Sequence, residues 1–253
     1  MAELVPSAEP AVELVGVGKR FRRHTDRRNS LKERIVRGRA RNPEDFWAVR
    51  DLSLTIPKGS VYGLIGHNGS GKSTLLKMVG GIYRPSTGTI TTQGRVAALI
   101  ELGAGFHPDM TGRENIALNG SILGLSRKEI AAVVDEIVDF SGLGEFIDDP
   151  VKHYSSGMYV RLGFSVAVHM KPDVLLVDEV LAVGDSKFKQ KCYNRLDEMM
   201  AGGDRTIFMV SHSERNLRRF CTRGLYVRHG EIVADGSIED TLDAYNAYMD
   251  TDA

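Results

Sequence analysis

The octapeptide GHNGSGKS at residues 66–73 constrains this chain more than any other feature of its sequence. It fits the pattern G-x-x-x-x-G-K-[ST] without a mismatch, and its glycines allow successive backbone N–H groups to turn toward phosphate oxygens. Residues 60–65 predict a buried strand before it, and residues 72–79 predict a helix with its positive N-terminal end at the loop. A glycine-rich turn without a ligand is the alternative. The strand before the loop and the helix after it favour nucleotide binding in an α/β fold instead.

The loop itself supplies most of the candidate nucleotide-binding residues. Lys72 is expected to bridge the β- and γ-phosphate oxygens, and Ser73 to hold Mg²⁺ through its hydroxyl. The residues assigned to nucleotide binding are those of the loop and the threonine after it: Gly66, His67, Asn68, Gly69, Ser70, Gly71, Lys72, Ser73 and Thr74.

Two adjacent carboxylates form a second candidate site. Four apolar residues at 174–177 predict a buried strand that ends in Asp178 and Glu179. Ligands of open α/β sheets bind at the carboxyl edge of the strands, so Asp178 is expected at that edge, where it orients Mg²⁺. Glu179 is expected to be the general base that polarises the attacking water. Solvated acids at a strand end are the alternative, which the upstream phosphate loop disfavours.

Short apolar runs alternate with helical patterns along the rest of the chain. Strands are predicted at 12–17, 48–56, 60–65, 89–92, 95–100, 174–177, 206–210, 225–227 and 231–234, with a basic segment interrupting the first strand from Lys19. Helices are predicted at 31–36, 72–79, 113–123, 126–140, 157–169, 186–200 and 238–249. Ser126 and Glu129 predict a capping box. This order predicts a mainly parallel sheet covered on both faces, after a flexible tail over residues 1–11.

Composition excludes several classes of protein. A hydrophobic content of 42% with 26% charged residues is typical of a globular chain. Two cysteines exclude a disulfide framework and a four-cysteine zinc site. No apolar run reaches the roughly 18–20 residues of a membrane span, and the N-terminus lacks the pattern of a signal peptide. We therefore expect a soluble chain in the cytoplasm.

The charges are balanced overall but unevenly distributed. The chain has 33 basic and 33 acidic residues, yet residues 19–41 contain eleven lysines and arginines against two acids. Such a block can meet nucleic acid, phospholipid head groups or an acidic ligand, or it can form a solvated surface loop. Phe21 is its only aromatic residue, so a nucleic-acid partner is not expected.

The segment YSSGM at residues 154–158 carries a resemblance to a known family. In its position between the two candidate sites it resembles the signature of ATP-binding cassette (ABC) ATPases, usually L-S-G-G-Q. A serine and a glycine at a helix N-terminus can present a hydroxyl and backbone N–H groups to a γ-phosphate. The resemblance implies that Ser155, Ser156 and Gly157 contact ATP bound to the other subunit of a head-to-tail dimer. From these residues alone, an ordinary helix N-cap is the alternative.

Further positions match motifs of this family. The resemblance implies that Asp185, in LAVGD, belongs to the D-loop that links the two sites of the dimer, and that His212 contacts the γ-phosphate. It implies Phe21 as the aromatic residue that stacks on adenine, with Trp47 as the substitute and core packing as the alternative for either. One departure concerns the glutamine that normally senses Mg²⁺, because the corresponding stretch has none and Glu101 is its nearest polar candidate.

The resemblance covers about residues 12–236 and narrows to one branch of the family. Residues 101–115, 154–167 and 178–192 resemble ATPase subunits that export lipid-linked polysaccharides such as O-antigen and teichoic acid. The implied fold is one ABC ATPase domain over 12–250. It has a RecA-like P-loop core with a β-rich edge, and a helical subdomain is inserted at about 103–170.

The implied activity is ATP hydrolysis with Mg²⁺ by a homodimer that drives a separate integral membrane permease. The subunit is expected on the cytoplasmic face of the inner membrane, acting indirectly on the lipid-linked polysaccharide. Three alternatives stay open at this point. One is an ABC ATPase for a drug or lipid, and another is a soluble ABC ATPase without a transport role. The third is a nucleotide-binding regulator with little turnover, which Glu179 and His212 disfavour.

Overall fold

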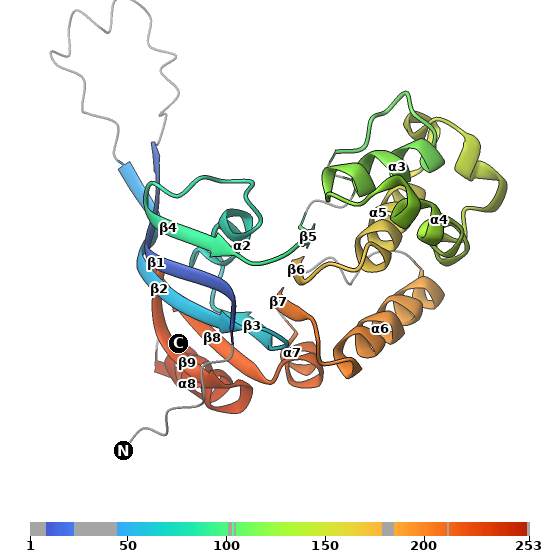
Figure 1. Cartoon of the computed structure of the whole chain (residues 1–253). Coiled ribbons are helices and arrows are strands. Elements are labelled where there is room, and N and C mark those ends of the chain that lie inside the picture. The colour runs from blue at the N-terminus through green and yellow to red at the C-terminus, as the bar shows by residue number, and fades with distance from the viewer. Residues whose placement is uncertain are drawn as a thin grey trace, which may run out of the picture.

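The structure is a computed structural model that describes residues 9–22, 45–100, 103, 105–178, 185–211 and 213–251. The strands are β1 (Pro10–Arg22), β2 (Asp45–Pro57), β3 (Val61–Ile65), β4 (Thr87–Thr92), β5 (Val96–Leu99), β6 (Val174–Asp178), β7 (Thr206–Val210), β8 (Arg223–Arg228) and β9 (Glu231–Ser237). Within the described residues they form two sheets (Figure 1). One has the order β2–β1–β4, and the other has the order β5–β6–β7–β3–β8–β9.

The helices surround the larger sheet and form a separate group beside it (Figure 1). They are α2 (Lys72–Val79), α3 (Gly112–Ile122), α4 (Arg127–Ser141), α5 (Ser156–His169), α6 (Ser186–Ala201), α7 (Glu214–Phe220) and α8 (Ile238–Thr251), with the 3₁₀ turns η1 (Gly144–Asp148) and η2 (Val151–His153). Among the described helices, none combines the length and the apolar character that crossing a membrane requires.

The six-stranded sheet is parallel except at β9, which pairs antiparallel with β8. Successive side chains of a strand point to opposite faces. Leu175 and Ile207 accordingly enter one hydrophobic cluster, and their neighbours Leu176 and Phe208 enter another. Burial on both faces explains why residues 174–177 are apolar without alternation. The predicted α/β fold, with a mainly parallel sheet covered on both faces, is confirmed.

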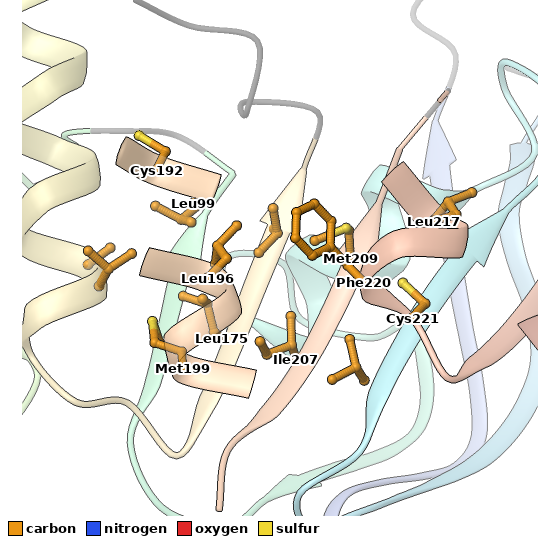
Figure 2. Close-up of a cluster of buried hydrophobic side chains, with 14 of the residues drawn as sticks. Leu99, Leu175, Cys192, Leu196, Met199, Ile207, Met209, Leu217, Phe220 and Cys221 are labelled. Atoms are coloured by element: carbon orange, nitrogen blue, oxygen red, sulfur yellow. The ribbon is translucent and has the colours of Figure 1, made fainter. Parts of the chain in front are cut away.

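The first cluster joins the sheet to α6 and α7. Figure 2 shows Leu175 and Ile207 of the sheet facing Leu196 of α6, with both cysteines in the same cluster. Burial raises the pKa of the Cys192 and Cys221 thiols to about 12 each. Both thiols therefore stay protonated at neutral pH and serve as apolar packing groups.

The three-stranded sheet covers α2. Its strand β1 is longer at both ends than the sequence predicted. β1 pairs with β2 as far as Arg22, so the basic segment does not interrupt the strand at Lys19. The strand also begins at Pro10, and Ala11 is buried, so these two residues are not part of the flexible tail predicted over residues 1–11. Residues 1–8 and the helix predicted at 31–36 lie outside the described residues.

Helices α3, α4 and α5 pack around a hydrophobic cluster of their own, set apart from the sheets (Figure 1). Ile116, Ile137 and Leu162 lie at its centre with no exposed surface. The predicted capping box opens α4. The amide of Glu129 donates to the Ser126 hydroxyl at 3.3 Å, and the amide of Ser126 donates to the Glu129 carboxylate at 2.7 Å.

Candidate nucleotide-binding site

The phosphate loop connects β3 to α2, and its backbone requires glycine at particular positions. Gly71 has a φ of 109° and is the N-cap of α2. A Cβ there would lie 2.3 Å from the carbonyl oxygen of Ala48, and a Cβ at Gly66 would lie 2.3 Å from that of Val227. Any larger residue would push the loop away from its neighbours. The sequence motif thus has a direct steric cause in this fold.

Lys72 is held inside the loop that precedes it. Its ammonium donates to the carbonyl oxygens of Gly66 at 2.6 Å and His67 at 2.9 Å. Burial lowers the pKa of Lys72 below its ordinary value, and the charge of Asp178 opposes that shift. The ammonium is therefore positioned at the loop, with carbonyl contacts that anionic phosphate oxygens can replace.

A cleft of about 290 Å³ opens beside the loop and receives residues from five segments of the chain. Its lining consists of Phe21, Phe46, Ala48, Asn68, Gly69, Gly71, Lys72, Ser73, Thr74, Asp178 and Val210. Three residues of the predicted set do not line it. Gly66 and His67 hold Lys72 instead, and Ser70 is fully buried.

Asp178 reaches the cleft because β6 ends there, next to Val210 at the end of β7. The strand and the loop meet at the carboxyl edge of the parallel sheet, where open α/β sheets bind ligands. The Asp178 carboxylate and the Ser73 hydroxyl line the same cleft. Both are hard oxygen donors of the type that Mg²⁺ takes together with substrate phosphates, so the residues present fit that ion.

Two phenylalanines form the other end of the cleft. Phe21 of β1 and Phe46 of β2 are directly opposite in the antiparallel register, which brings their side chains to the same face. Phe21 also contacts the ring of Tyr83 edge-on at 5.7 Å between centroids. Trp47 does not line this cleft, and its indole lies under the Arg20 guanidinium at 5.6 Å. Phe46 thus lines the cleft beside Phe21, and the adenine contact expected of Phe21, with Trp47 as its substitute, stays a prediction.

The signature residues lie on the helical group and not in this cleft. Ser155 is the N-cap of α5, and its hydroxyl accepts from the amide of Met158 at 3.2 Å. Ser155 and Ser156 are exposed, and Gly157 is partly exposed. The N-terminus of α5 thus presents hydroxyls and amides outward, in an arrangement that suits an anion brought by another molecule.

Asp185 is the N-cap of α6 and joins that helix to α5. Its carboxylate accepts from the amide of Phe188 at 2.8 Å and forms an ion pair with Arg161 of α5. The guanidinium of Arg161 also lies 5.2 Å from the centre of the Phe188 ring. The Phe188 amide and Arg161 lower the pKa of Asp185. Sequence reasoning missed Arg161, although its place three residues after Met158 puts it on the signature helix.

Three predicted site residues, Glu101, Glu179 and His212, lie outside the described residues. The assignments of Glu179 as base, His212 as phosphate contact and Glu101 as metal contact stay predictions.

A family model described as ABC transporter matches residues 49–182, more than half of the chain. The O-antigen export system ATP-binding protein RfbB of Myxococcus xanthus is 44% identical over 248 residues, which is 95% of this chain and 56% of the relative. This chain thus spans little more than half the length of that relative. The ABC transporter protein AbcA of Aeromonas salmonicida is 43% identical, covering 96% of this chain and 78% of the relative.

A third relative is the teichoic acids export ATP-binding protein TagH of Staphylococcus epidermidis, which is 42% identical over 95% of this chain and 90% of its own length. The dimeric ATP-binding cassette MJ0796, bound to ADP and Pi, has the same fold with a TM-score of 0.70. It is 21% identical, covering 90% of this chain and 98% of the other. With a matching family model and relatives above 40% identity along nearly its whole length, the chain belongs to the ABC transporter family.

Proposed function

We propose that this chain is the ATP-hydrolysing subunit of an exporter that moves a lipid-linked polysaccharide across the cytoplasmic membrane. The observation that carries the ATPase is the meeting of the phosphate loop and Asp178 in one cleft. The polysaccharide is supported by relatives named for O-antigen and teichoic acid export, which align along 94% or more of this chain.

Different residues of the cleft bind the base, the phosphates and the Mg²⁺ ion of ATP. Phe21 and Phe46 stack on the base, and the loop amides and Lys72 bind the phosphates. Asp178 and Ser73 would hold Mg²⁺, which when bound neutralises the charge that develops on the transferred phosphoryl group. Glu179 takes the proton of the attacking water, and His212 contacts the γ-phosphate.

The active form is proposed to be a homodimer. Each cleft has a phosphate loop but no signature residue in its lining, and the exposed N-terminus of α5 carries Ser155 and Ser156. A second copy can supply these groups to the γ-phosphate, so that ATP closes the dimer and hydrolysis reopens it. The ion pair between Arg161 and Asp185 connects α5 to the N-terminus of α6.

The dimer is proposed to act on the cytoplasmic face of the membrane with a permease encoded separately. The names of the relatives support this partner, because they describe ATP-binding proteins of export systems. Co-expression with the permease is the test of this part. The subunit should sediment with membranes when the permease is present and stay in the supernatant when it is absent, and equal distribution in both cases contradicts the proposed partner.

The ATPase assignment is tested by Glu179→Gln. This variant should bind Mg²⁺–ATP with an affinity within about twofold of wild type, because the phosphate-binding groups remain. Its steady-state turnover should fall about 100-fold or more, because the base is lost. Glu145→Gln, at an exposed position on η1, is the matched control and should hydrolyse ATP normally. Wild-type turnover in Glu179→Gln contradicts the role of that residue.

A further inference from the structure

A second cavity, of about 600 Å³, lies next to the nucleotide cleft and has no role in the proposed hydrolysis. It shares Phe46 and Gly69 with the cleft and continues along β2 to Trp47 and Arg50. The tip of the β8–β9 hairpin forms its other wall. The volume is in the range of about 300–1,000 Å³ that small-molecule sites occupy.

Two arginines line this second cavity, and neither guanidinium has a hydrogen-bond partner within the described chain. The Arg50 guanidinium makes no hydrogen bond or ion pair within the described chain. Arg228 stacks on the ring of Tyr248 at 3.8 Å, and its Nε is buried without a hydrogen-bond partner among the described residues. His229 adds a third nitrogen group, and Glu231 is the one acid in the lining that the structure describes. Unsatisfied guanidinium donors around a concave site are suited to an anion such as phosphate.

An aromatic wall adjoins these cations. Trp47 and Phe46 both line the cavity, and the Trp47 ring is held by the Arg20 guanidinium, which in turn pairs with Asp45 at 3.1 Å. A fixed indole offers a flat surface on which a planar ring can stack. The combination of a flat aromatic wall with the Arg50 guanidinium and the unpaired Nε of Arg228 matches a ligand that has both a heterocyclic ring and a phosphate.

We propose that this second cavity binds a nucleoside phosphate, separate from the ATP in the cleft. Its phosphate lies on Arg50 and Arg228, and its base lies against Trp47. The cavity is mechanically joined to the phosphate loop, because the amide of Gly230 donates to the Ser70 carbonyl at 2.9 Å and the amide of Arg50 donates to the Gly230 carbonyl at 2.8 Å.

Trp47 is the only tryptophan of the chain, so the intrinsic tryptophan fluorescence comes from a residue that lines this cavity. The experiment titrates ADP into the full chain carrying Lys72→Ala, in which binding to the phosphate loop is weakened. We expect saturable quenching of Trp47 fluorescence, and about tenfold or more weaker binding when Arg50→Glu is added. Arg228→Gln in the same background should also weaken binding, which guards against a folding defect in either variant.

The matched control is Arg127→Glu, an equal charge change at an exposed position on α4, which should leave the titration unchanged. Pyrophosphate and adenosine titrated separately should each bind more weakly than ADP. Three results overturn the proposal: no quenching in the Lys72→Ala chain, quenching that survives both arginine substitutions, or pyrophosphate binding as tightly as ADP. These readouts need no ATP hydrolysis, so a failure of the proposed ATPase would not be confused with them.

Discussion

Lys72 shows how much a single side chain of the cleft depends on its surroundings. Its ammonium is buried and donates to two loop carbonyl oxygens, at 2.6 and 2.9 Å. Removing the charge with Lys72→Ala should weaken ATP binding by about 1.5–3 kcal/mol, the range of a hydrogen bond to a charged group. Titration with a fluorescent ATP analogue measures this. Lys128→Ala, at an exposed position on α4, should bind as wild type does.

Phe46 is the residue through which the cleft differs most from the sequence expectation. Its side chain is 54% exposed in the structure, and ATP is expected to cover it. Phe46→Ala should therefore weaken ATP binding, with a loss of about 1–3 kcal/mol in binding free energy for a fully stacked base. Trp47→Ala is the neighbouring control and should leave ATP affinity within about twofold. Equal losses in both variants would contradict the division between the two cavities.

The sequence predicts a site residue when the signal for it lies within a few neighbouring residues. The phosphate loop and Asp178 could be expected at one sheet edge because both follow buried strands, and the structure brings them into one cleft. Phe46 could not be found this way. It reaches the cleft through its pairing with Phe21, across 25 residues of sequence, and nothing in the sequence fixes that register.

At the scale of elements, the N-terminus of α6 is fixed by one side chain with two partners. Asp185→Ala removes both the hydrogen bond from the Phe188 amide and the ion pair with Arg161, so the urea midpoint of unfolding should fall. Asp185→Asn keeps a capping oxygen and loses only a partly exposed ion pair, which contributes little. Its midpoint should stay near wild type. Equal midpoints for the two variants would show that capping is not the main contribution.

The elements that sequence predicted well have local signals. The capping box of α4 and the short apolar runs of β8 and β9 are encoded within a few residues each. The full length of β1 is not, because Lys19–Arg22 are strand residues only through their pairing with β2. Helix α7 escaped prediction because it has seven residues, of which only Leu217 and Phe220 are buried, too few for a helical period.

At the scale of the whole molecule, the buried His169 makes stability depend on pH. Burial lowers its pKa from 6.5, an effect that Arg195 and Lys191 reinforce, while the Ser165 carbonyl and Glu136 oppose it. As pH falls below about 6.5, the unfolded chain takes up a proton that the folded chain still resists. The free energy of unfolding should therefore decrease over that interval, whereas it is unaffected by this group above it.

Urea unfolding at a series of pH values between about 5 and 8 measures this dependence. The chain has seven histidines, so the contribution of His169 is isolated by comparison with His169→Gln. In that variant the loss of stability on acidification should be smaller. An identical pH dependence in the two proteins would contradict the effect of burial.

The local pattern of polar and apolar residues could not predict that the strands form two sheets. The sequence of β4, TGTITT, does not indicate which sheet it joins, and the structure pairs it with β1. The antiparallel sheet closes over α2 through apolar residues such as Leu14 and Leu75, which share one cluster. Such long-range packing decides which sheet a strand joins.

Hairpin tips are customary places to insert a peptide tag or a fluorescent protein, because an exposed turn usually has few contacts. The turn between β8 and β9 lacks that freedom. Gly230 bonds to Ser70 and Arg50 through its backbone, and a Cβ there would lie 2.8 Å from the Ala48 carbonyl oxygen. A reporter inserted at this tip would disturb the loop it was meant to observe. The turn at Gly124, where an added Cβ meets nothing within 4 Å, is the better insertion point for labelling this protein.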